Sequence, residues 1–301
     1  IIMTEKKHDV LTIGRSSIDL YSQNIGAPFN DIKGFDAFVG GSPLNIAVGC
    51  ARLGVNASLL SGVGDDKVGT FILNFLENEG VNTQCISTIK GTRSSAVVLG
   101  IEPPDKFPLV YYRDNAADSQ ITIDDVIKAK INDYKIVLLN GTALNIEPTR
   151  SATFFAAEVA DKNDIDVVLD LDFRADQWHD YRAFGLTIRA LLSKVKIAIG
   201  TEEEILAATM SSTSQVTIKD QQISAPEIKG DIDSSIQQLL ALGIETLIVK
   251  KGSAGASIHY PDGSKKDVPG FPVEILNVLG AGDAFASGFL YGILQGWDLY
   301  K

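Results

Sequence analysis

Short apolar segments alternate with amphipathic ones along most of the chain, and this alternation limits the fold more than any other feature. Segments such as Val167-Val168-Leu169 are apolar without interruption, as in strands that are covered on both faces. Strands that alternate with helices form parallel βαβ units, with helices on both sides of one sheet. The sequence therefore predicts a single α/β domain over residues 1–301, with three layers and a mostly parallel central sheet.

The apolar segments give the predicted strands, and the amphipathic segments give the predicted helices. The predicted strands are Asp9–Ile13, Ala57–Gly62, Ile136–Leu139, Asp166–Leu171, Ile197–Ile199, Thr246–Lys250, Ala256–His259 and Pro272–Val278. The predicted helices are Pro43–Leu53, Lys67–Asn78, Pro148–Asn163, Tyr181–Val195, Glu202–Thr209, Ser234–Leu242 and Gly282–Gln295.

Two stretches interrupt the alternation, residues 16–38 and residues 94–115. The second reads as two strands, Ser95–Ile101 and Pro108–Arg113, around the turn at Pro103-Pro104. We expect these stretches to form a small β-sheet that lies outside the main layer as a lid. Thr209–Asp231 is polar and is expected to be a solvated surface excursion.

The charge and composition of the chain limit the classes of partner that it is expected to bind. With 27 basic and 38 acidic side chains the formal net charge is −11, which argues against nucleic acid as a partner. No apolar run approaches the roughly 20 residues that span a bilayer, so we expect no membrane partner. The two cysteines, Cys50 and Cys85, form no metal motif and suit a reducing cytoplasm.

The glycine-rich segment Gly280-Ala281-Gly282-Asp283 precedes an apolar helix and carries the strongest chemical signal. Glycines before a helix let backbone N–H groups converge, and the helix dipole adds positive charge there, which suits a transferring phosphoryl group. Asp283 is placed to accept a proton from an attacking hydroxyl. The alternative is that Asp283 simply caps the helix.

A second segment, Gly40-Gly41-Ser42-Pro43-Leu44-Asn45, predicts a helix start with Ser42 as its cap and Pro43 in its first turn. The glycines permit a ligand to approach the backbone, and Asn45 can bind a hydroxyl. A tight turn with a polar helix face is the alternative.

Three further segments follow predicted strands, at the edge where parallel sheets bind ligands. They are Lys250-Lys251-Gly252-Ser253-Ala254-Gly255, Asp170-Leu171-Asp172-Phe173-Arg174 and Thr201-Glu202-Glu203-Glu204. The first suits a nucleotide, the second an anion or a structural ion pair, and the third either water around Mg²⁺ or a helix dipole. No P-loop pattern occurs in the chain, so a phosphate-transferring enzyme would not be of that type.

Taken together and in this order, the segments resemble the ribokinase-like PfkB family of carbohydrate kinases over nearly the whole chain. The resemblance implies ATP-dependent phosphorylation of a sugar hydroxyl, with ATP and Mg²⁺ bound. It implies that Asp283 is the catalytic base and that the amides after Gly280, those of Ala281, Gly282 and Asp283, form an anion hole. It assigns Asp19, Gly40, Gly41 and Asn45 to the sugar, Lys250, Gly252, Ser253, Gly255 and Thr201 to the nucleotide, and Glu204 to Mg²⁺ through water.

The chain departs from the family pattern in two places. Asn277-Val278-Leu279 replaces the usual Asp-Thr, which leaves K⁺ as an open third cofactor, and Thr201 replaces an Asn. Family members also continue past the equivalent of Lys301 with a further helix, so that helix is expected to be missing here.

The stretch Asp170–Trp178 resembles that of keto-deoxy sugar acid kinases, and with Arg113–Asp118 it is most similar to 5-dehydro-2-deoxygluconokinases of bacterial myo-inositol catabolism. The acid's carboxylate needs a cation, for which Arg15, Arg113 and Arg174 are candidates beside Asp172. A 2-dehydro-3-deoxygluconokinase, a fructokinase or ribokinase, a nucleoside kinase and a non-catalytic sugar-acid sensor are the alternatives. The resemblance also implies a homodimer that forms through the lid.

Overall fold

The computed structural model describes residues 6–102, 106–218, 226–274 and 278–300. The strands of its main sheet are β1 (His8–Ile13), β4 (Ala57–Gly64), β5 (Ile86–Ile89), β8 (Tyr134–Asn140), β9 (Asp166–Asp170), β10 (Ile197–Thr201), β13 (Thr246–Lys250), β14 (Ala256–His259) and β15 (Lys265–Val268). The helices are α1 (Ser42–Arg52), α2 (Lys67–Asn78), α3 (Ile123–Ala129), α4 (Thr149–Lys162), α5 (Tyr181–Leu191), α6 (Glu202–Thr209), α7 (Ile232–Leu240) and α8 (Ala281–Leu294).

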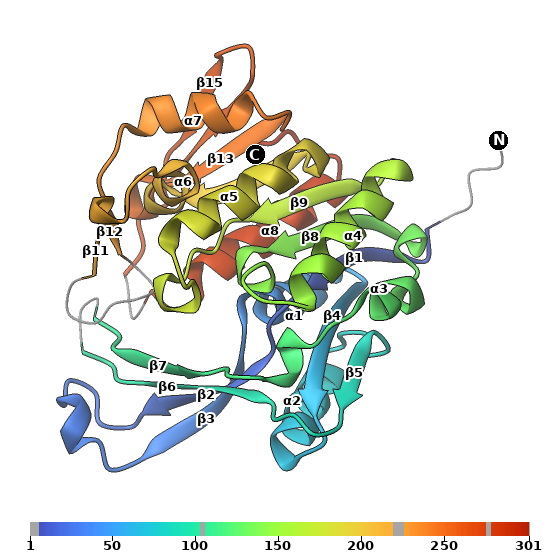
Figure 1. Cartoon of the computed structure of the whole chain (residues 1–301), viewed down its shortest axis with the longest axis vertical. Helices are drawn as coiled ribbons and strands as arrows, with labels where there is room; N and C mark the ends of the chain where they lie inside the picture. Colours follow the sequence, from blue (N-terminus) through green and yellow to red (C-terminus); the bar gives the residue numbers. More distant parts are fainter. Residues whose placement is uncertain (1–5, 103–105, 219–225, 275–277, 301) are drawn as a thin grey trace.

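The main sheet has nine strands in the order β15-β14-β13-β10-β9-β8-β1-β4-β5 (Figure 1). The strands from β5 to β13 pair in parallel, whereas β14 and β15 run antiparallel at one edge. The predicted α/β class with a mostly parallel sheet is confirmed. The sheet order also brings the carboxyl ends of β9, β10 and β13 side by side, which is where a ligand site is expected.

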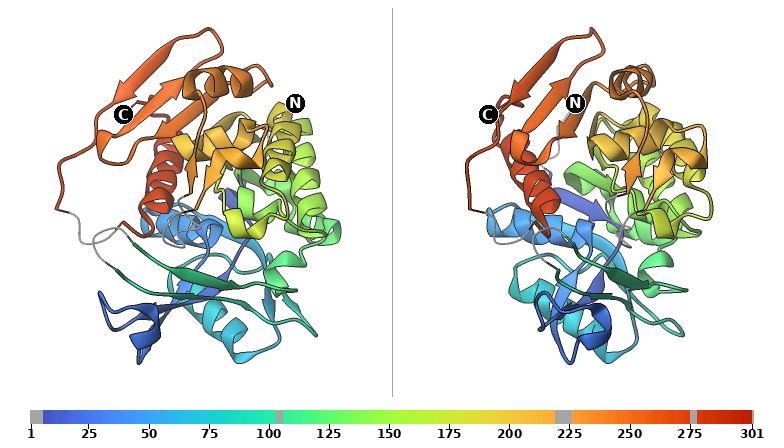
Figure 2. Two further views of the ribbon diagram at one scale, coloured as in Figure 1. Left: turned by 60° about the vertical axis from the view of Figure 1, so that its left-hand side comes forward. Right: turned by 90° about the vertical axis from the view of Figure 1, so that its left-hand side faces the viewer.

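Helices cover both faces of the sheet, with α1, α2 and α8 on one side and α3 to α7 on the other (Figure 2). β9 shows why its sequence is apolar throughout. Val167 and Leu169 lie in the core under α3 to α7, and Val168 lies in the core under α1 and α8. A strand that is buried on both faces has no position for a polar side chain, which is the physical basis of the prediction.

A separate four-stranded sheet, hereafter the small sheet, lies beside the carboxyl end of β1 (Figure 1). Its order is β3 (Phe35–Gly40), β2 (Ser17–Ser22), β6 (Ser95–Leu99) and β7 (Leu109–Tyr112). The two stretches that interrupt the alternation therefore pair with each other, and the predicted hairpin strands are present with slightly shorter bounds. The turn at Pro103-Pro104 lies outside the described residues.

Several local predictions were incomplete or wrong. Strands β5 and β15 and helix α3 were missed, because edge strands lack a continuous apolar run and α3 is only seven residues long. The capping box of α3, in which Thr122 and Asp125 exchange hydrogen bonds, is a signal that could have revealed this helix. In the stretch predicted as a strand at Pro272–Val278, the described residues 272–274 form none and Val273 is 74% exposed.

Two smaller features complete the fold. The polar stretch 209–231 contains a two-stranded ribbon of β11 (Val216–Thr217) and β12 (Glu227–Ile228) in its described part. The cap of α1 is Gly41 and not Ser42, which is the first residue of the helix instead. Within the described residues, no helix is both long and apolar enough to cross a bilayer.

Candidate active site

A cleft of about 490 Å³ opens at the carboxyl ends of β9, β10 and β13, facing the N-terminus of α8. Most of the polar residues that the sequence analysis assigned to ligand binding lie in this cleft. The predicted site residues that line this polar cleft are Asp172, Arg174, Thr201, Glu204, Lys250, Gly280, Gly282 and Asp283.

Asp283 lies in the first turn of α8 without capping it, because the cap position belongs to Gly280, whose φ of 77° suits glycine. Its carboxylate instead accepts a hydrogen bond of 2.8 Å from Nδ2 of Asn45, which lies 238 residues earlier on α1. Burial raises the pKa of Asp283, and the hydrogen bonds from Asn45 and Ser42 oppose that rise. A buried carboxylate with a raised pKa is suited to accept a proton.

The backbone at the start of α8 offers free N–H groups beside Asp283. The Ala281 amide donates to the Val278 carbonyl at 3.2 Å, whereas the amides of Gly282 and Asp283 make no hydrogen bond within the described part of the chain. A Cβ atom on Gly282 would lie 3.5 Å from Nζ of Lys250. Two amides, a helix dipole and an ammonium group thus converge on one point, which is an arrangement suited to anionic oxygens.

Lys250 joins the strand ends of the cleft to one another. Its Nζ lies 3.3 Å from Asp170 and 3.9 Å from Glu204. Burial acts to lower the pKa of Lys250, but the two carboxylates outweigh it and raise the pKa, so that the ammonium stays charged. Burial raises the pKa of Asp170 in turn, against the pull of Lys250.

Glu204 has a structural role and a free oxygen. Its Oε2 accepts from the Thr201 amide at 2.8 Å, and the Thr201 hydroxyl accepts from the Glu204 amide at 3.2 Å, which makes a capping box for α6. The other oxygen, Oε1, makes no hydrogen bond within the described residues. The described residues contain no group of three or more ligands that could hold a metal. Mg²⁺ usually keeps most of its waters, and a carboxylate such as that of Glu204, in the lining of the cleft, suits a hydrated ion.

The predicted sugar residues Asp19, Gly40 and Gly41 lie together where the small sheet meets α1. Ser17 Oγ donates to Asp19 at 2.7 Å. A Cβ on Gly40 would lie 2.0 Å from the Asp19 carboxylate, and one on Gly41, with a φ of 113°, would lie 2.3 Å from the Arg15 carbonyl. Both glycines are therefore required by close packing, and their role in binding the sugar stays a prediction.

Asp172 and Arg174 form an ion pair of 2.6 Å on one wall of the cleft, which is the structural alternative that the sequence left open. Asp172 has a φ of 39°, an uncommon conformation for a residue other than glycine. Arg113 does not line the cleft. Its Nη2 instead lies 2.7 Å from Oδ2 of the fully buried Asp118.

A second hollow of about 450 Å³, hereafter the apolar hollow, runs along the side of α8. Gly252 and Gly255 line it, together with Phe285 and Phe289 of α8, while Ser253 does not. Gly255 has a φ of 89°, and a Cβ there would lie 2.0 Å from the Val268 carbonyl, so this turn requires glycine.

The predicted site omitted Ser42 and Asp170, both of which line the polar cleft. Asp170 could have been included, because it is the last residue of a buried strand, and Asp172, which was included, follows it by two residues. Ser42 gave no such signal, since its hydrogen bond from Asn140 Nδ2 at 3.1 Å joins residues 98 positions apart. The replacement of the Asp-Thr motif begins at Asn277, which lies outside the described residues.

Comparisons with known proteins identify the family of this chain. A family model described as "pfkB family carbohydrate kinase" matches residues 7–301. The 5-dehydro-2-deoxygluconokinase of Clostridium tetani is 33% identical over 98% of this chain and 84% of its own length. The enzyme of that name from Geobacillus thermodenitrificans is 31% identical over 99% of this chain and 84% of its own.

Solved structures share the fold. A sugar kinase from Pyrococcus horikoshii in complex with ATP superposes with a TM-score of 0.78 at 26% identity, over 95% of this chain and 84% of its own. A PfkB protein from a Polaromonas species reaches a TM-score of 0.81 at 22% identity, over 97% of this chain and 90% of its own. The chain belongs to the pfkB family of carbohydrate kinases and is a phosphotransferase that acts on a sugar.

Proposed function

We propose that this kinase transfers the γ-phosphoryl group of ATP to the terminal hydroxyl of 5-dehydro-2-deoxygluconate, forming the 6-phosphate. The observation that carries the chemistry is the Asp283 carboxylate, which Asn45 holds in the first turn of α8. Lys250 Nζ comes within 3.5 Å of a Cβ placed on the neighbouring Gly282. The names of the relatives support the choice of acid. The fold alone would serve any sugar of similar size.

In the proposed reaction, Asp283 accepts the proton of the sugar hydroxyl. The hydroxyl oxygen forms a bond to the γ-phosphorus while the bond from that phosphorus to the β-phosphate oxygen breaks, and ADP leaves with the electron pair. The free amides of Gly282 and Asp283, with Lys250, stabilise the negative charge on the transferred group. Mg²⁺, when bound, would neutralise phosphate charge, and Glu204 would hold it through water.

The apolar hollow suits the adenine of ATP, because it adjoins the start of α8 and is lined by aromatic and small residues. We assign Gly252 and Gly255 to this part of the nucleotide, with Ser253 beside them. Asp19, Gly40, Gly41 and Asn45 are assigned to the sugar, whose reactive hydroxyl must reach Asp283.

The small sheet is proposed to close over the sugar as a lid, which would exclude water that could otherwise accept the phosphoryl group. It exposes apolar side chains, among them Phe38 at 49%, Val110 at 45% and Tyr112 at 61%. These would suit a homodimer through the lid. Sedimentation of the wild-type chain and of Val110→Glu tests this, and a monomer at all concentrations would remove the dimer from the proposal.

A coupled assay of ADP release tests the main proposal. It compares 5-dehydro-2-deoxygluconate and 2-dehydro-3-deoxygluconate with fructose and ribose as neutral controls. We expect the first acid to have the highest kcat/KM. A higher value for the second acid would change the substrate, and neutral sugars equal to both acids would refute the sugar-acid assignment. Sugar binding without ADP release would indicate a sensor.

The two cysteines are unpaired, Cys50 in the core and Cys85 half-buried. Unpaired thiols fit a reducing compartment, and we include a cytoplasmic location in the proposal.

A further inference from the structure

Three arginines are candidates for binding the acid, namely Arg15, Arg113 and Arg174, and of these only Arg174 lines the polar cleft. A sugar acid carries a carboxylate that a neutral sugar lacks, and an arginine is the side chain that best matches it. The arginines differ in what each already binds, and this difference indicates which one is available.

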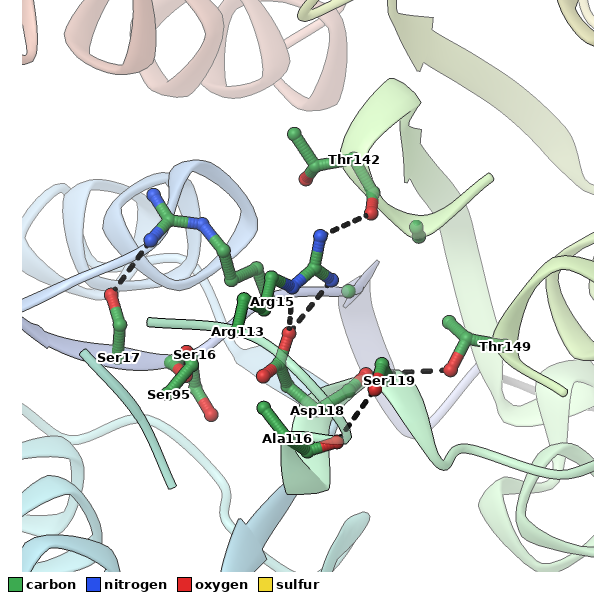
Figure 3. Close-up of polar contacts among 12 residues, drawn as sticks. Arg15, Ser16, Ser17, Ser95, Arg113, Ala116, Asp118, Ser119, Thr142 and Thr149 are labelled. Carbon is green, nitrogen blue, oxygen red and sulfur yellow. Dashed lines mark hydrogen bonds and ion pairs between the residues drawn. The ribbon is translucent and has the colours of Figure 1, made fainter. Parts of the chain in front are cut away.

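Arg113 is held by the protein through Nε and Nη1, while its buried Nη2 makes no hydrogen bond among the described residues but lies 2.7 Å from Asp118 Oδ2. Its Nε donates to Asp118 at 2.7 Å, and its Nη1 donates to the Thr142 carbonyl at 2.9 Å and to Gln177 Oε1 at 2.7 Å. Figure 3 shows its guanidinium group turned toward Asp118 and Thr142. Because Asp118 is fully buried, it already neutralises this charge. Arg113 therefore ties the end of the small sheet to the main domain.

Arg174 is neutralised as well, by Asp172 at 2.6 Å. It also shares the polar cleft with the acidic side chains of Asp170, Glu204 and Asp283. A carboxylate substrate that bound here would have to compete with Asp172 and would meet further negative charge.

Arg15 has no such partner. Its side chain is buried, with 8% of the residue exposed, and its Nη1 donates to Ser17 Oγ at 2.9 Å. Its Nε is buried and makes no hydrogen bond, and among the described residues it forms no ion pair. The guanidinium carbon lies 5.1 Å from the centre of the Tyr111 ring, which holds its plane in place. Burial acts to lower the pKa of Arg15, but Tyr111 and nearby acids such as Asp19 outweigh it and raise the pKa. The charge is therefore balanced by its surroundings without a direct ion pair in the described part of the chain, which leaves one side of the guanidinium group open to a ligand.

The surroundings of Arg15 place it at the sugar end of the site. Ser17 accepts from Arg15 and donates to Asp19 at 2.7 Å, so one hydroxyl links the arginine to a proposed sugar residue. Figure 3 shows the guanidinium group of Arg15 turned toward Ser17 and away from Asp118. The charges of Asp19, Arg15 and Asp283 all act on the Tyr21 hydroxyl, although burial contributes most to raising its pKa to about 12. Arg15 and Asp19 are thus joined through Ser17 at the end of the site assigned to the sugar.

We infer that Arg15 binds the carboxylate of the sugar acid through the unpaired side formed by Nε and Nη2, and that it thereby sets the preference for acids over neutral sugars. This inference rests on the proposed function. Arg113 then ties the small sheet to the main domain, and Arg174 forms part of the wall of the cleft. Ser17 and Tyr111 fix the orientation of the Arg15 guanidinium group.

The test compares the acid with its methyl ester, which has the same reactive hydroxyl but no negative charge. In Arg15→Gln, we expect the KM for 5-dehydro-2-deoxygluconate to rise about tenfold to a hundredfold, as for a lost charged hydrogen bond, with kcat changed much less. The KM for the methyl ester should stay within about twofold, because the ester makes no use of the charge.

Arg15→Lys provides a second variant that keeps the charge but loses the fork. We expect an acid-selective rise in KM that is smaller than that of Arg15→Gln. If Arg15→Gln fails to fold, this variant carries the test alone. As a matched control, Arg52→Gln removes an exposed arginine at the far end of α1, paired only with Glu79 within the described chain, and should leave both substrates unaffected.

A binding measurement separates recognition from catalysis. The acid should raise the thermal midpoint of the wild type and not of Arg15→Gln, whereas ATP should raise both.

Equal losses on acid and ester in both Arg15 variants would overturn the inference, as would an acid-selective loss in Arg113→Lys with none at Arg15. If wild type itself shows no preference for the acid over the ester, the proposed substrate class fails, and the inference fails with it. Acid preference in wild type that persists in the Arg15 variants refutes the inference alone.

Discussion

The polar cleft and the apolar hollow share one helix, α8, yet they differ in almost every physical respect. Asp283 in the first turn of α8 faces a cleft with six acidic and two basic side chains. Further along the same helix, Phe285 and Phe289 face a hollow whose described lining residues include one charged side chain, that of Asp298. Similar volumes therefore have opposite character, which suits charge transfer at the end of the helix and a flat, apolar group along its side.

Position along a helix can separate chemistry from binding. The free amides and the dipole act only within the first turn, so the charged groups gather there. The flank offers only side chains, and its small residues leave room. If this is correct, changes at the helix end should alter kcat, and changes on the flank should alter the KM for ATP.

The largest effect is expected for Asp283→Asn. Removing the base should lower kcat by about 10²- to 10⁴-fold, because an amide cannot accept the proton. Binding of sugar and ATP should be largely retained, which equilibrium titration of both ligands would check. Turnover near the wild-type rate would refute the role of Asp283 and with it the contrast between helix end and flank.

The second-largest effect is expected for Glu204→Gln. A glutamine can still accept the hydrogen bond from the Thr201 amide, so the cap of α6 should survive while the charge is lost. We expect activity at limiting Mg²⁺ to fall about 10- to 100-fold and to recover in part at high Mg²⁺. Glu202→Gln, an exposed neighbour in the same helical turn, is the control and should titrate like the wild type.

The pH dependence should report the burial of Asp283. Since its pKa lies above the ordinary value of 3.8, kcat/KM should begin to fall at a higher pH than a normal aspartate would cause, about tenfold per unit below that pKa. The raised pKa also means that the folded state binds this proton more tightly than the unfolded state. The stabilisation from this group is present below the ordinary pKa and is lost as pH rises through the raised one.

Thermal denaturation of wild type and Asp283→Asn over a pH series measures that linkage. The variant should be the more stable protein near neutral pH, with a difference that shrinks in acid. A difference that is independent of pH would show that the carboxyl has no raised pKa.

The smallest effect is expected on the flank, at Gly288, where an added Cβ would meet no atom within 4 Å. Gly288→Leu should fill part of the apolar hollow and raise the KM for ATP about tenfold, with the KM for the sugar unchanged. Gly288→Ala is the control, which should stabilise the helix by about 0.5–1 kcal/mol and leave kinetics nearly intact. A rise in the sugar KM instead would place the sugar, and not adenine, along the flank.

The sequence predicted the parts of this protein that are governed by local rules. Val167 to Leu169 showed a strand that is buried on both faces, and the glycines before Asp283 showed a helix start with free amides. Residues 272–274 show the limit of such rules, because they belong to a stretch predicted as a strand but are exposed and form none. The same limit hid β15, whose side chains are mostly exposed.

By itself, the sequence determined the α/β class, the small sheet and the residue types at the carboxyl ends of the strands, because period, glycine and proline act over a few residues. Only the tertiary structure decided which of these residues meet. It joined Asn45 to Asp283 across 238 residues, and it gave Asp118 to Arg113 while leaving the Arg15 Nε without a hydrogen bond among the described residues. Contacts between distant segments depend on packing and on burial of charge, which local patterns do not encode.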